Sequence, residues 1–267
     1  MLIIISPAKK LDFESQPQTD DFTLPQCLDD ASELIDTLRT YSSAQLEKLM
    51  HLSKNLAELN YQRYLDWSQP FNPQNAKQAL LTFKGDVYAG MHVESFSDED
   101  LAFTQEHLRI VSGLYGLLRP LDLMQPYSLE LGSRLNNSRV KNLYEFWGDK
   151  ITELINQQLK ASKSDTLVNL ASNEYYKSVK PGQIDGQIIT PLFKEKIVKE
   201  KTAKEKQQET YKVIGIYAKK ARGMMSAFIL QNRLTDVEQI NTFNEGGYAY
   251  NPQLSNHNYW LFSRDKK

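Results

Sequence analysis

The sequence predicts a mixed α/β fold in which a central mixed sheet, flanked by helices, forms a single domain over residues 1–267. Three observations predict it. Short continuous apolar runs, such as residues 2–5, have the length and β-branched content of buried strands. Longer segments place apolar residues three or four positions apart, as amphipathic helices do. In the second half of the chain the two kinds of segment alternate, which favours a sheet containing parallel strands.

The chain is large enough for this fold and shows no internal repeat. Its 267 residues suffice for one large or two small domains, and its hydrophobic content of 40% suits a packed core. We therefore expect one domain with two additions, an acidic helical lobe at about 25–67 and a Lys-rich mobile insert at about 194–209.

The first elements are a strand and a group of helices. Residues 2–5 form the strand, which Pro7 stops, and the helical pattern occupies residues 25–67. Within that pattern Ser42 and Gln45 have the spacing of a capping box, which marks the start of a helix.

Charge is distributed unevenly along the chain. Residues 11–60 hold ten acidic and three basic side chains, a net charge of −7 that leaves +6 for the remainder. The folded chain can separate these charges and present a basic cleft, or both sets can simply be solvated on the surface.

Two helices and two strands follow. Residues 97–108 predict a helix with acids in its first turn, and residues 140–159 predict one long helix with an apolar stripe. Residues 166–171 and 211–217 are apolar runs of strand length, each followed by a helical pattern. The charges of the insert at 194–209 alternate in sign, which is typical of a solvated hairpin or loop.

Several classes of protein are disfavoured by composition. Cys27 is the only cysteine, which excludes an internal disulfide framework and fits a reducing cytosol. No apolar run approaches the roughly 20 residues of a membrane-spanning helix. The apolar run at the N-terminus is too short for a secretion signal and has no basic region before it. We expect a cytoplasmic monomer with no membrane contact.

Metal and nucleophilic chemistry also find little support. The four histidines have no ligand-like spacing to one another or to Cys27, so we expect no metal and no cofactor. An acidic helix follows Cys27 and should raise the pKa of its thiol, which makes it a poor nucleophile. The glycine-rich phosphate-binding motifs and G-x-S-x-G do not occur.

Four apolar runs share a layout that suggests a site. Each is followed by small or polar residues and then, within about ten positions, by a base. The four following segments are Ser6–Lys10, Ser112–Arg119, Ser172–Lys177 and Ala218–Gly223. Ligands collect beyond the carboxyl ends of parallel strands, and helices that start there aim free N–H groups at them. If the runs are parallel, the segments meet and form a cleft suited to phosphate.

The stretch SGLYGLLRP, residues 112–120, has two interpretations. A tight turn alone explains Gly113 and Gly116, since glycine adopts positive φ at little cost. Alternatively, a glycine-bounded turn resembles the helix-hairpin-helix module, in which turn amides hold DNA phosphates without reading sequence. The match is imperfect because Leu114 and Tyr115 separate the glycines, where the usual turn has one residue. Both interpretations stay open.

The stretch YAKKARGMM carries three bases in four positions. Lys219, Arg222 and Ser226 share one face of the predicted helix, with Lys220 and Gly223 beside it. Bases at the start of an apolar helix are costly to bury without partners. They either bind an anion at the cleft or form salt bridges at the helix start.

Catalytic candidates are fewer. Lys84 and Asp86, with Asn173, Glu174 and Lys177, fall near predicted strand ends and could perform general acid–base chemistry. They could equally form the polar lining of a binding cleft.

Together these segments resemble the YaaA family of bacterial peroxide stress resistance proteins, over essentially the whole chain. The matching pieces are SPAKK, FKGDVYAG, RIVSGLYGLLRPLDLMQPYSLELG, LYEFWGDKI, LVNLASNEYYKSV, IYAKKARGMM, GYAYN and WLFSR. The resemblance implies an unusual α/β fold with a basic cleft and a helix-hairpin-helix-like element. It also implies binding of DNA, double-stranded or distorted, with little sequence preference, and protection from peroxide by keeping free iron low.

Carried onto this chain, the resemblance places the hairpin at residues 112–120, with Gly113 and Gly116 in its turn. It draws the bases of the cleft from Lys9, Lys10, Lys84, Arg109, Arg119, Arg134, Lys150, Lys177, Lys219, Lys220 and Arg222. No function is carried onto the Lys-rich insert, and no Glu-x-x-His pairs support iron storage.

Two other functions remain as alternatives. The chain could be an enzyme acting on a nucleotide, nucleobase or nucleic acid, which requires a closed pocket with a perturbed carboxylate or lysine. It could instead be an interaction module that uses the acidic helices within residues 11–60 as a docking face.

Overall fold

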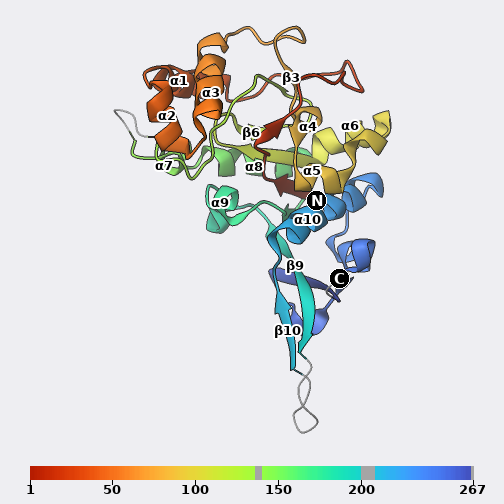
Figure 1. The fold of residues 1–267 in the computed structure, drawn as a ribbon. Helices are drawn as coiled ribbons and strands as arrows, with labels where there is room; N and C mark the ends of the chain where they lie inside the picture. Colours follow the sequence, from red (N-terminus) through yellow and green to blue (C-terminus); the bar gives the residue numbers. More distant parts are fainter. Residues whose placement is uncertain (136–139, 200–207, 266–267) are drawn as a thin grey trace.

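The computed structural model describes residues 1–135, 140–199 and 208–265. It is a mixed α/β single domain, as predicted, built around an eight-stranded mixed sheet (Figure 1). The strands are β1 (Leu2–Ile5), β2 (Lys10–Leu11), β3 (Lys77–Gln78), β4 (Phe83–Lys84), β5 (Leu108–Ser112), β6 (Gly116–Leu118), β7 (Leu123–Met124), β8 (Thr166–Asn169), β9 (Gln187–Lys199), β10 (Gln208–Lys212), β11 (Ala249–Tyr250) and β12 (Tyr259–Asp265).

The centre of the sheet is formed by the apolar runs. Strand β1 lies between β5 and β8 and is parallel to both, and every residue of the three strands is buried. The sheet order is β11-β12-β9-β8-β1-β5-β6, with β10 paired to β9. Burial on both sides explains why these strands read as continuous apolar runs and not as alternating ones. The strands predicted at residues 2–5 and 166–171 are confirmed, and the apolar run before the segment Ser112–Arg119 forms β5.

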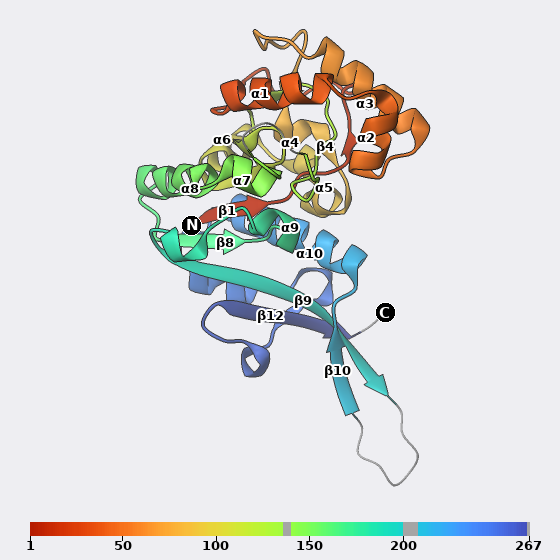
Figure 2. The same cartoon turned by 90° about the vertical axis from the view of Figure 1, so that its left-hand side faces the viewer.

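Helices cover both faces of the sheet. They are α1 (Leu28–Arg39), α2 (Ser43–Met50), α3 (Lys54–Asp66), α4 (Ala79–Thr82), α5 (Asp86–Met91), α6 (Asp98–His107), α7 (Leu143–Trp147), α8 (Lys150–Ala161), α9 (Asn173–Tyr176) and α10 (Gly215–Gln231). Figure 2 shows α7, α8 and α9 on one face and α6 and α10 on the other. Helices α1–α3 form the predicted helical group, and Ser42 and Gln45 make the predicted capping box. None of the described helices is long and apolar enough to cross a membrane.

Two predictions of secondary structure are wrong. The long helix expected over residues 140–159 is two helices, because Gly148 adopts a φ of +50° between α7 and α8. The strand expected over residues 211–217 ends at Lys212, and α10 begins at Gly215. That short apolar run belongs to the helical period of α10, whose Ala218 and Ala221 face the core.

The stretch SGLYGLLRP forms a β-hairpin, so the predicted helix-hairpin-helix is also wrong. Strands β5 and β6 pair antiparallel, with Ser112 opposite Gly116. The Ser112 hydroxyl accepts hydrogen bonds from the amides of Leu114 and Tyr115, at 3.2 and 3.0 Å. Residues 111–118 are all buried. The turn amides therefore face the core and cannot reach a phosphate.

The glycines of this turn are required by packing. Gly116 has a φ of +67°, and a Cβ there would lie 2.6 Å from the Trp147 ring. A Cβ on Gly113 would lie 2.2 Å from the carbonyl oxygen of Leu129. The Trp147 indole N–H donates to the Gly113 carbonyl at 3.0 Å. The hairpin is thus clamped between α7 and the segment that follows β7.

The Lys-rich insert begins as a hairpin. Strand β9 continues beyond the sheet and pairs with β10, so the two project from the body of the molecule (Figure 2). At its base Glu195 is buried and accepts from Arg264 Nε at 2.9 Å and from the Tyr248 hydroxyl at 2.5 Å. The predicted hairpin or loop is a hairpin over the described residues, while residues 200–207, which make up much of the insert, lie outside them.

Candidate functional site

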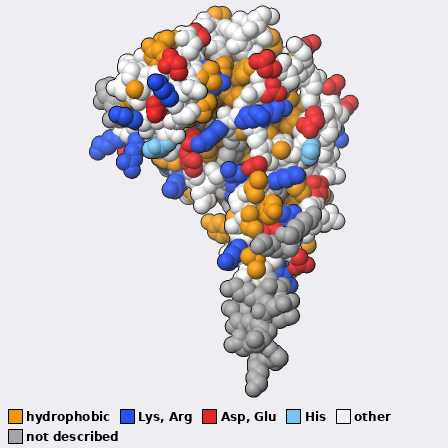
Figure 3. All heavy atoms as spheres, viewed as in Figure 1, with side chains coloured by type: hydrophobic (Ala, Val, Ile, Leu, Met, Phe, Trp, Pro, Cys, Tyr) orange, Lys and Arg blue, Asp and Glu red, His pale blue; other side chains and the backbone are white. Residues whose placement is uncertain are grey.

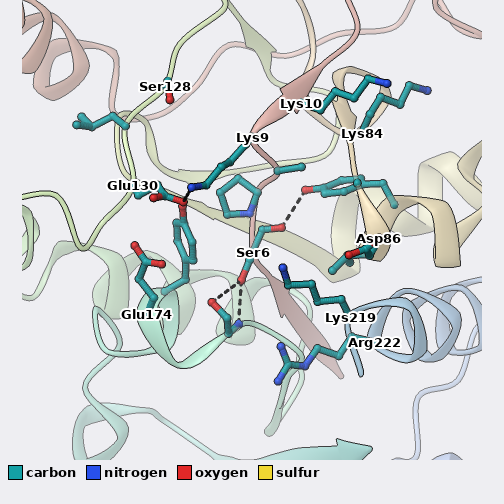
Figure 4. A pocket seen from close by; sticks show the side chains of 18 of the residues that line it. Ser6, Lys9, Lys10, Lys84, Asp86, Ser128, Glu130, Glu174, Lys219 and Arg222 are labelled. Atoms are coloured by element: carbon teal, nitrogen blue, oxygen red, sulfur yellow. Dashed lines mark hydrogen bonds and ion pairs between the residues drawn. The ribbon is translucent and has the colours of Figure 1, made fainter. Parts of the chain in front are cut away.

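A cavity of about 400 Å³ opens at the carboxyl ends of β1 and β8 (Figure 4). Five separate segments line it. They are residues 6–10, residues 84–88, residues 127–130, the group Ser172, Glu174 and Tyr175, and the side of α10 that carries Lys219 and Arg222. Three of the four segments that were predicted to meet therefore do so, and residues 112–119 do not line the cavity.

The floor of the cavity is tied together at Ser6, the first residue after β1. Its hydroxyl accepts from the amide of Ser172 at 2.8 Å and donates to the Ser172 hydroxyl at 3.3 Å. Its carbonyl accepts from the Tyr88 hydroxyl at 3.1 Å. These bonds join the ends of two parallel strands to α5, so the lining is held by rigid elements.

Helix α10 is placed by an unusually close approach to α5. A Cβ on Gly223 would lie 1.8 Å from the carbonyl oxygen of Val87, and a Cβ on Gly90 would lie 2.1 Å from the carbonyl oxygen of Lys220. Two glycines facing each other let the backbones touch. The contact brings Lys219 and Arg222 to the cavity wall beside α5 (Figure 4).

Two of the lining lysines are held by carboxylates. Lys9 pairs with Glu130 at 3.0 Å, and Lys84 pairs with Asp12 at 3.6 Å. Both lysine side chains are exposed, so these pairs hold their positions weakly and leave them able to exchange partners.

Three further cations have no ion pair among the described residues: Lys10, Lys219 and Arg222. Arg222 is half-buried, and burial alone lowers the pKa of its guanidinium. A half-buried cation without a carboxylate is unfavourable unless an anion binds there. The cavity wall therefore carries cationic charge that no carboxylate within the described residues offsets.

The lining also contains polar groups that are not basic. Asp86 and the hydroxyl of the buried Tyr175 make no hydrogen bond or ion pair within the part of the chain that the structure describes. Burial raises the pKa of the Tyr175 phenol, which therefore stays neutral at physiological pH. Glu174 instead accepts from the amide of Gly132 at 2.9 Å, so its role is partly structural.

Two of the predicted bases are used by the fold. Arg109 is buried and donates to the carbonyls of Gln105 and Leu108, and burial lowers its pKa to about 10. Arg119 pairs with the buried Asp122 at 2.9 Å and donates to the Leu24 carbonyl at 2.7 Å. Neither side chain reaches the cavity.

The other predicted residues lie outside the lining. Lys150 on α8 bonds to Asp30 of α1 at 2.7 Å. The remaining four are exposed and do not line the cavity: Arg134, Asn173, Lys177 and Lys220. Of the predicted catalytic cluster, the cavity thus gathers only Lys84, Asp86 and Glu174.

Several lining residues were missed by the sequence reasoning. Ser6 lay in a named segment but was not singled out, and Tyr127, Ser128 and Glu130 follow β7, which the sequence did not predict. The sequence held only an indirect signal for these residues, which is the stretch at 112–120. The Ser112 hydroxyl of that stretch lies 2.7 Å from the Tyr127 hydroxyl, so the buried hairpin packs behind the cavity.

The remaining chemical features are the Cys27 thiol and the side chains that could bind a metal ion. Cys27 is buried, and burial, with a smaller effect from Asp30, raises the pKa of its thiol to about 11. The predicted rise is confirmed, with burial as its main cause. Among the described residues, no group of three or more His, Cys, Asp or Glu side chains could hold a metal ion.

A family model and several relatives match nearly the whole chain. A family model described as "Peroxide stress protein YaaA" matches residues 1–254. A "UPF0246 protein" of Cellvibrio japonicus (strain Ueda107) is 53% identical over 266 residues, which is 100% of this chain and 99% of the relative. The corresponding proteins of Teredinibacter turnerae and Saccharophagus degradans are each 52% identical over 264 residues, covering 99% of both chains.

Proposed function

The chain belongs to the YaaA family of peroxide stress proteins, and from this premise we propose that it binds DNA largely without sequence preference and so limits iron-dependent oxidative damage. The observation that carries the proposal is the set of unpaired cations at one cavity. Lys10, Lys219 and Arg222 lack carboxylate partners among the described residues and lie beside Lys9 and Lys84. Bases without partners are what a phosphate backbone requires.

The proposal differs from the sequence-based expectation in the groups that contact phosphate. The turn amides at Leu114 and Tyr115 are already bonded to Ser112, so the contacts fall to side chains. Figure 3 shows Lys and Arg side chains spread over this face of the molecule. Side chains that hold phosphates without touching base edges give affinity but no sequence preference.

We assign the protective effect to DNA and not to storage of iron. The chemistry of the cavity favours anions, because its free charges are mostly cations. Cytoplasmic location and a monomeric state are compatible with this function and are part of the proposal.

The test is the salt dependence of DNA affinity, measured by fluorescence anisotropy with two labelled duplexes of unrelated sequence. We expect equal affinities that fall steeply with salt. Lys219→Gln with Arg222→Gln removes two phosphate contacts, so the slope of log K against log salt should become shallower by about 1.8. The loss should be the same for both duplexes.

The matched control is Lys48→Gln with Lys160→Gln, two exposed lysines on α2 and α8 outside the cavity lining. It should leave the slope unchanged within error. If the cavity variant binds both duplexes like the unaltered protein, the cavity has no part in DNA binding.

One observation supports the alternative that the protein is an enzyme. The bases surround a partly open cavity whose wall carries Asp86, a carboxylate without a partner among the described residues. Conversion of a nucleotide or DNA strand that is lost in Asp86→Asn, while DNA affinity is kept, would favour an enzyme over a binding protein.

A further inference from the structure

We propose that the cavity receives a single nucleotide extruded from DNA, and that Ile216 at the start of α10 fills the space the nucleotide leaves. The inference rests on the DNA-binding function proposed above and deepens it. It names the part of DNA that enters the site, a nucleotide that is unpaired or weakly paired.

The first argument is the size of the cavity. Its volume of about 400 Å³ falls in the range of about 300–1,000 Å³ that is usual for small-molecule pockets. A duplex, whose major groove alone is about 12 Å wide, cannot enter it. A backbone that merely lies across the surface would leave the cavity empty. A single nucleotide is the unit of DNA whose size suits it.

The second argument is the mixed chemistry of the wall. Lys219 and Arg222 offer free cations for a phosphate. Asp86 and the Tyr175 hydroxyl, which also lack partners among the described residues, offer an acceptor and a neutral hydroxyl. A carboxylate repels phosphate, so Asp86 has no use at a surface that binds only the backbone. Nucleobases present N–H donors together with acceptors, which these two groups can satisfy.

Lys219 and Asp86 do not neutralise each other, although Figure 4 shows them on facing helices. No ion pair joins them among the residues that the structure describes. An unpaired cation and an unpaired carboxylate thus share one cavity. Such an arrangement suits a ligand with an anionic end and a neutral polar end, as a nucleotide has.

The third argument is an exposed apolar group about one helical turn before Lys219. Ile216 and Val213 are 59% and 57% exposed, although both lie in an apolar run. Ile216, Lys219 and Arg222 are spaced three apart, so they follow one another along one side of α10 toward the cavity. Proteins that unstack DNA insert apolar side chains of this kind between base steps.

The start of α10, which carries Ile216, is held in place by its neighbours. Its neighbour Tyr217 packs under the guanidinium of Arg264, at 4.9 Å from the ring centroid, and Arg264 is bonded to Glu195. An inserted side chain has to keep its place while bases separate, and the start of α10 is anchored in this way.

The experiment uses duplexes with 2-aminopurine at one position, either in a matched pair or in a one-nucleotide bulge. Anisotropy reports binding, and 2-aminopurine fluorescence reports unstacking of that base. We expect the bulged duplex to bind about tenfold more tightly than the matched one, with a several-fold rise in fluorescence on binding. Extrusion costs least for a base that is already unpaired.

Ile216→Ala should abolish most of the fluorescence rise and the preference for the bulge, while affinity for the matched duplex stays within twofold. Leu59→Ala is the control, since this exposed leucine lies on α3 outside the cavity lining. It should behave like the unaltered protein. Equal affinity for both duplexes with unchanged fluorescence would overturn the inference and leave DNA binding intact. Failure to bind either duplex would instead overturn the proposed function, and the inference with it.

Discussion

At the scale of single residues, the glycines of this chain act through packing. Gly113 and Gly223 both stand in segments that suggested phosphate binding, and both touch a backbone carbonyl of another element. A backbone carbonyl cannot move aside as a flexible side chain can, so these positions exclude any Cβ. The function of each glycine is to let two elements approach, and the approach of α10 to α5 builds one wall of the cavity.

This gives the first stability prediction, for Gly223→Ala. A Cβ at this position would lie 1.8 Å from the Val87 carbonyl oxygen, so the helices must separate. We expect a loss of about 1–3 kcal/mol in the free energy of unfolding, as for other overpacked sites. Urea unfolding followed by circular dichroism measures it.

Gly215→Ala provides a control in the same helix. Nothing lies within 4 Å of a Cβ at this position. The substitution should stabilise the protein by about 0.4–1 kcal/mol, because it restricts the unfolded chain without a clash. Equal effects of the two substitutions would contradict the packing role assigned to Gly223.

The unpaired Arg222 is the other feature at this scale. Its pKa is lowered by burial, and no carboxylate within the described residues offsets that cost. Residues that weaken the fold without local compensation are typical of functional sites. Arg222 stands out only because its guanidinium lacks a carboxylate partner among the described residues. Residue types in the sequence do not reveal whether such a partner is present.

At the scale of elements, the β9–β10 hairpin depends on a buried charge at its base. Glu195 lies between Arg264 of β12 and the Tyr248 hydroxyl, and the guanidinium of Arg264 covers the rings of Tyr248 and Tyr217. This cluster connects the hairpin, the edge of the sheet and the start of α10. It determines where the hairpin leaves the body of the protein.

Glu195→Gln should therefore be strongly destabilising. The amide cannot neutralise Arg264, which would be left as a largely buried charge without an ion-pair partner, and such losses cost about 3–5 kcal/mol. The measurement is again urea unfolding. Glu209→Gln on the same hairpin is the control, because its pair with Lys196 is exposed and should matter little. Comparable losses in both variants would show that burial of the pair is irrelevant.

At the scale of the whole molecule, one hydrophobic cluster runs through the chain. It includes Ala31 and Leu34 of the helical lobe, Ile3 of the central strand and Phe262 of β12. A shared core predicts that the lobe at 25–67 unfolds together with the sheet.

Three tryptophans test this cooperativity. Trp67 follows the last residue of α3, Trp147 ends α7 and packs against the β5–β6 hairpin, and Trp260 belongs to β12. Variants that keep one tryptophan, with phenylalanine at the other two positions, should show the same urea midpoint by fluorescence and by circular dichroism. An earlier transition for Trp67 alone would mean that the helical lobe is a separate domain.

The charge asymmetry of the sequence is also resolved at this scale. Part of the acidic region pairs with bases of the remainder, as Asp30 does with Lys150 and Asp12 with Lys84. Hydrogen bonds from Ser15, helped by Lys77, hold the pKa of Asp12 well below its usual range. The two charge sets are thus neither fully separated nor merely solvated.

The sequence by itself determined the elements whose signal is local. Continuous apolar runs identified β1, β5 and β8, and capping and apolar spacing identified α1–α3 and α6, since these depend on neighbours within a few positions. It also indicated that the segments after β1 and β8 meet, because parallel strands end at one edge. The break at Gly148 was not predicted, because apolar spacing continues across it.

Only the tertiary structure decided which bases are free. Arg109 and Arg119 look like Lys219 and Arg222 in the sequence. The side chains of the first two are bonded within the fold, whereas those of the last two have no ion-pair partner among the described residues. Partners that satisfy a charge can come from anywhere in the chain, as Leu24 does for Arg119. Residue type and spacing carry no record of such contacts, because they arise only when distant segments fold together.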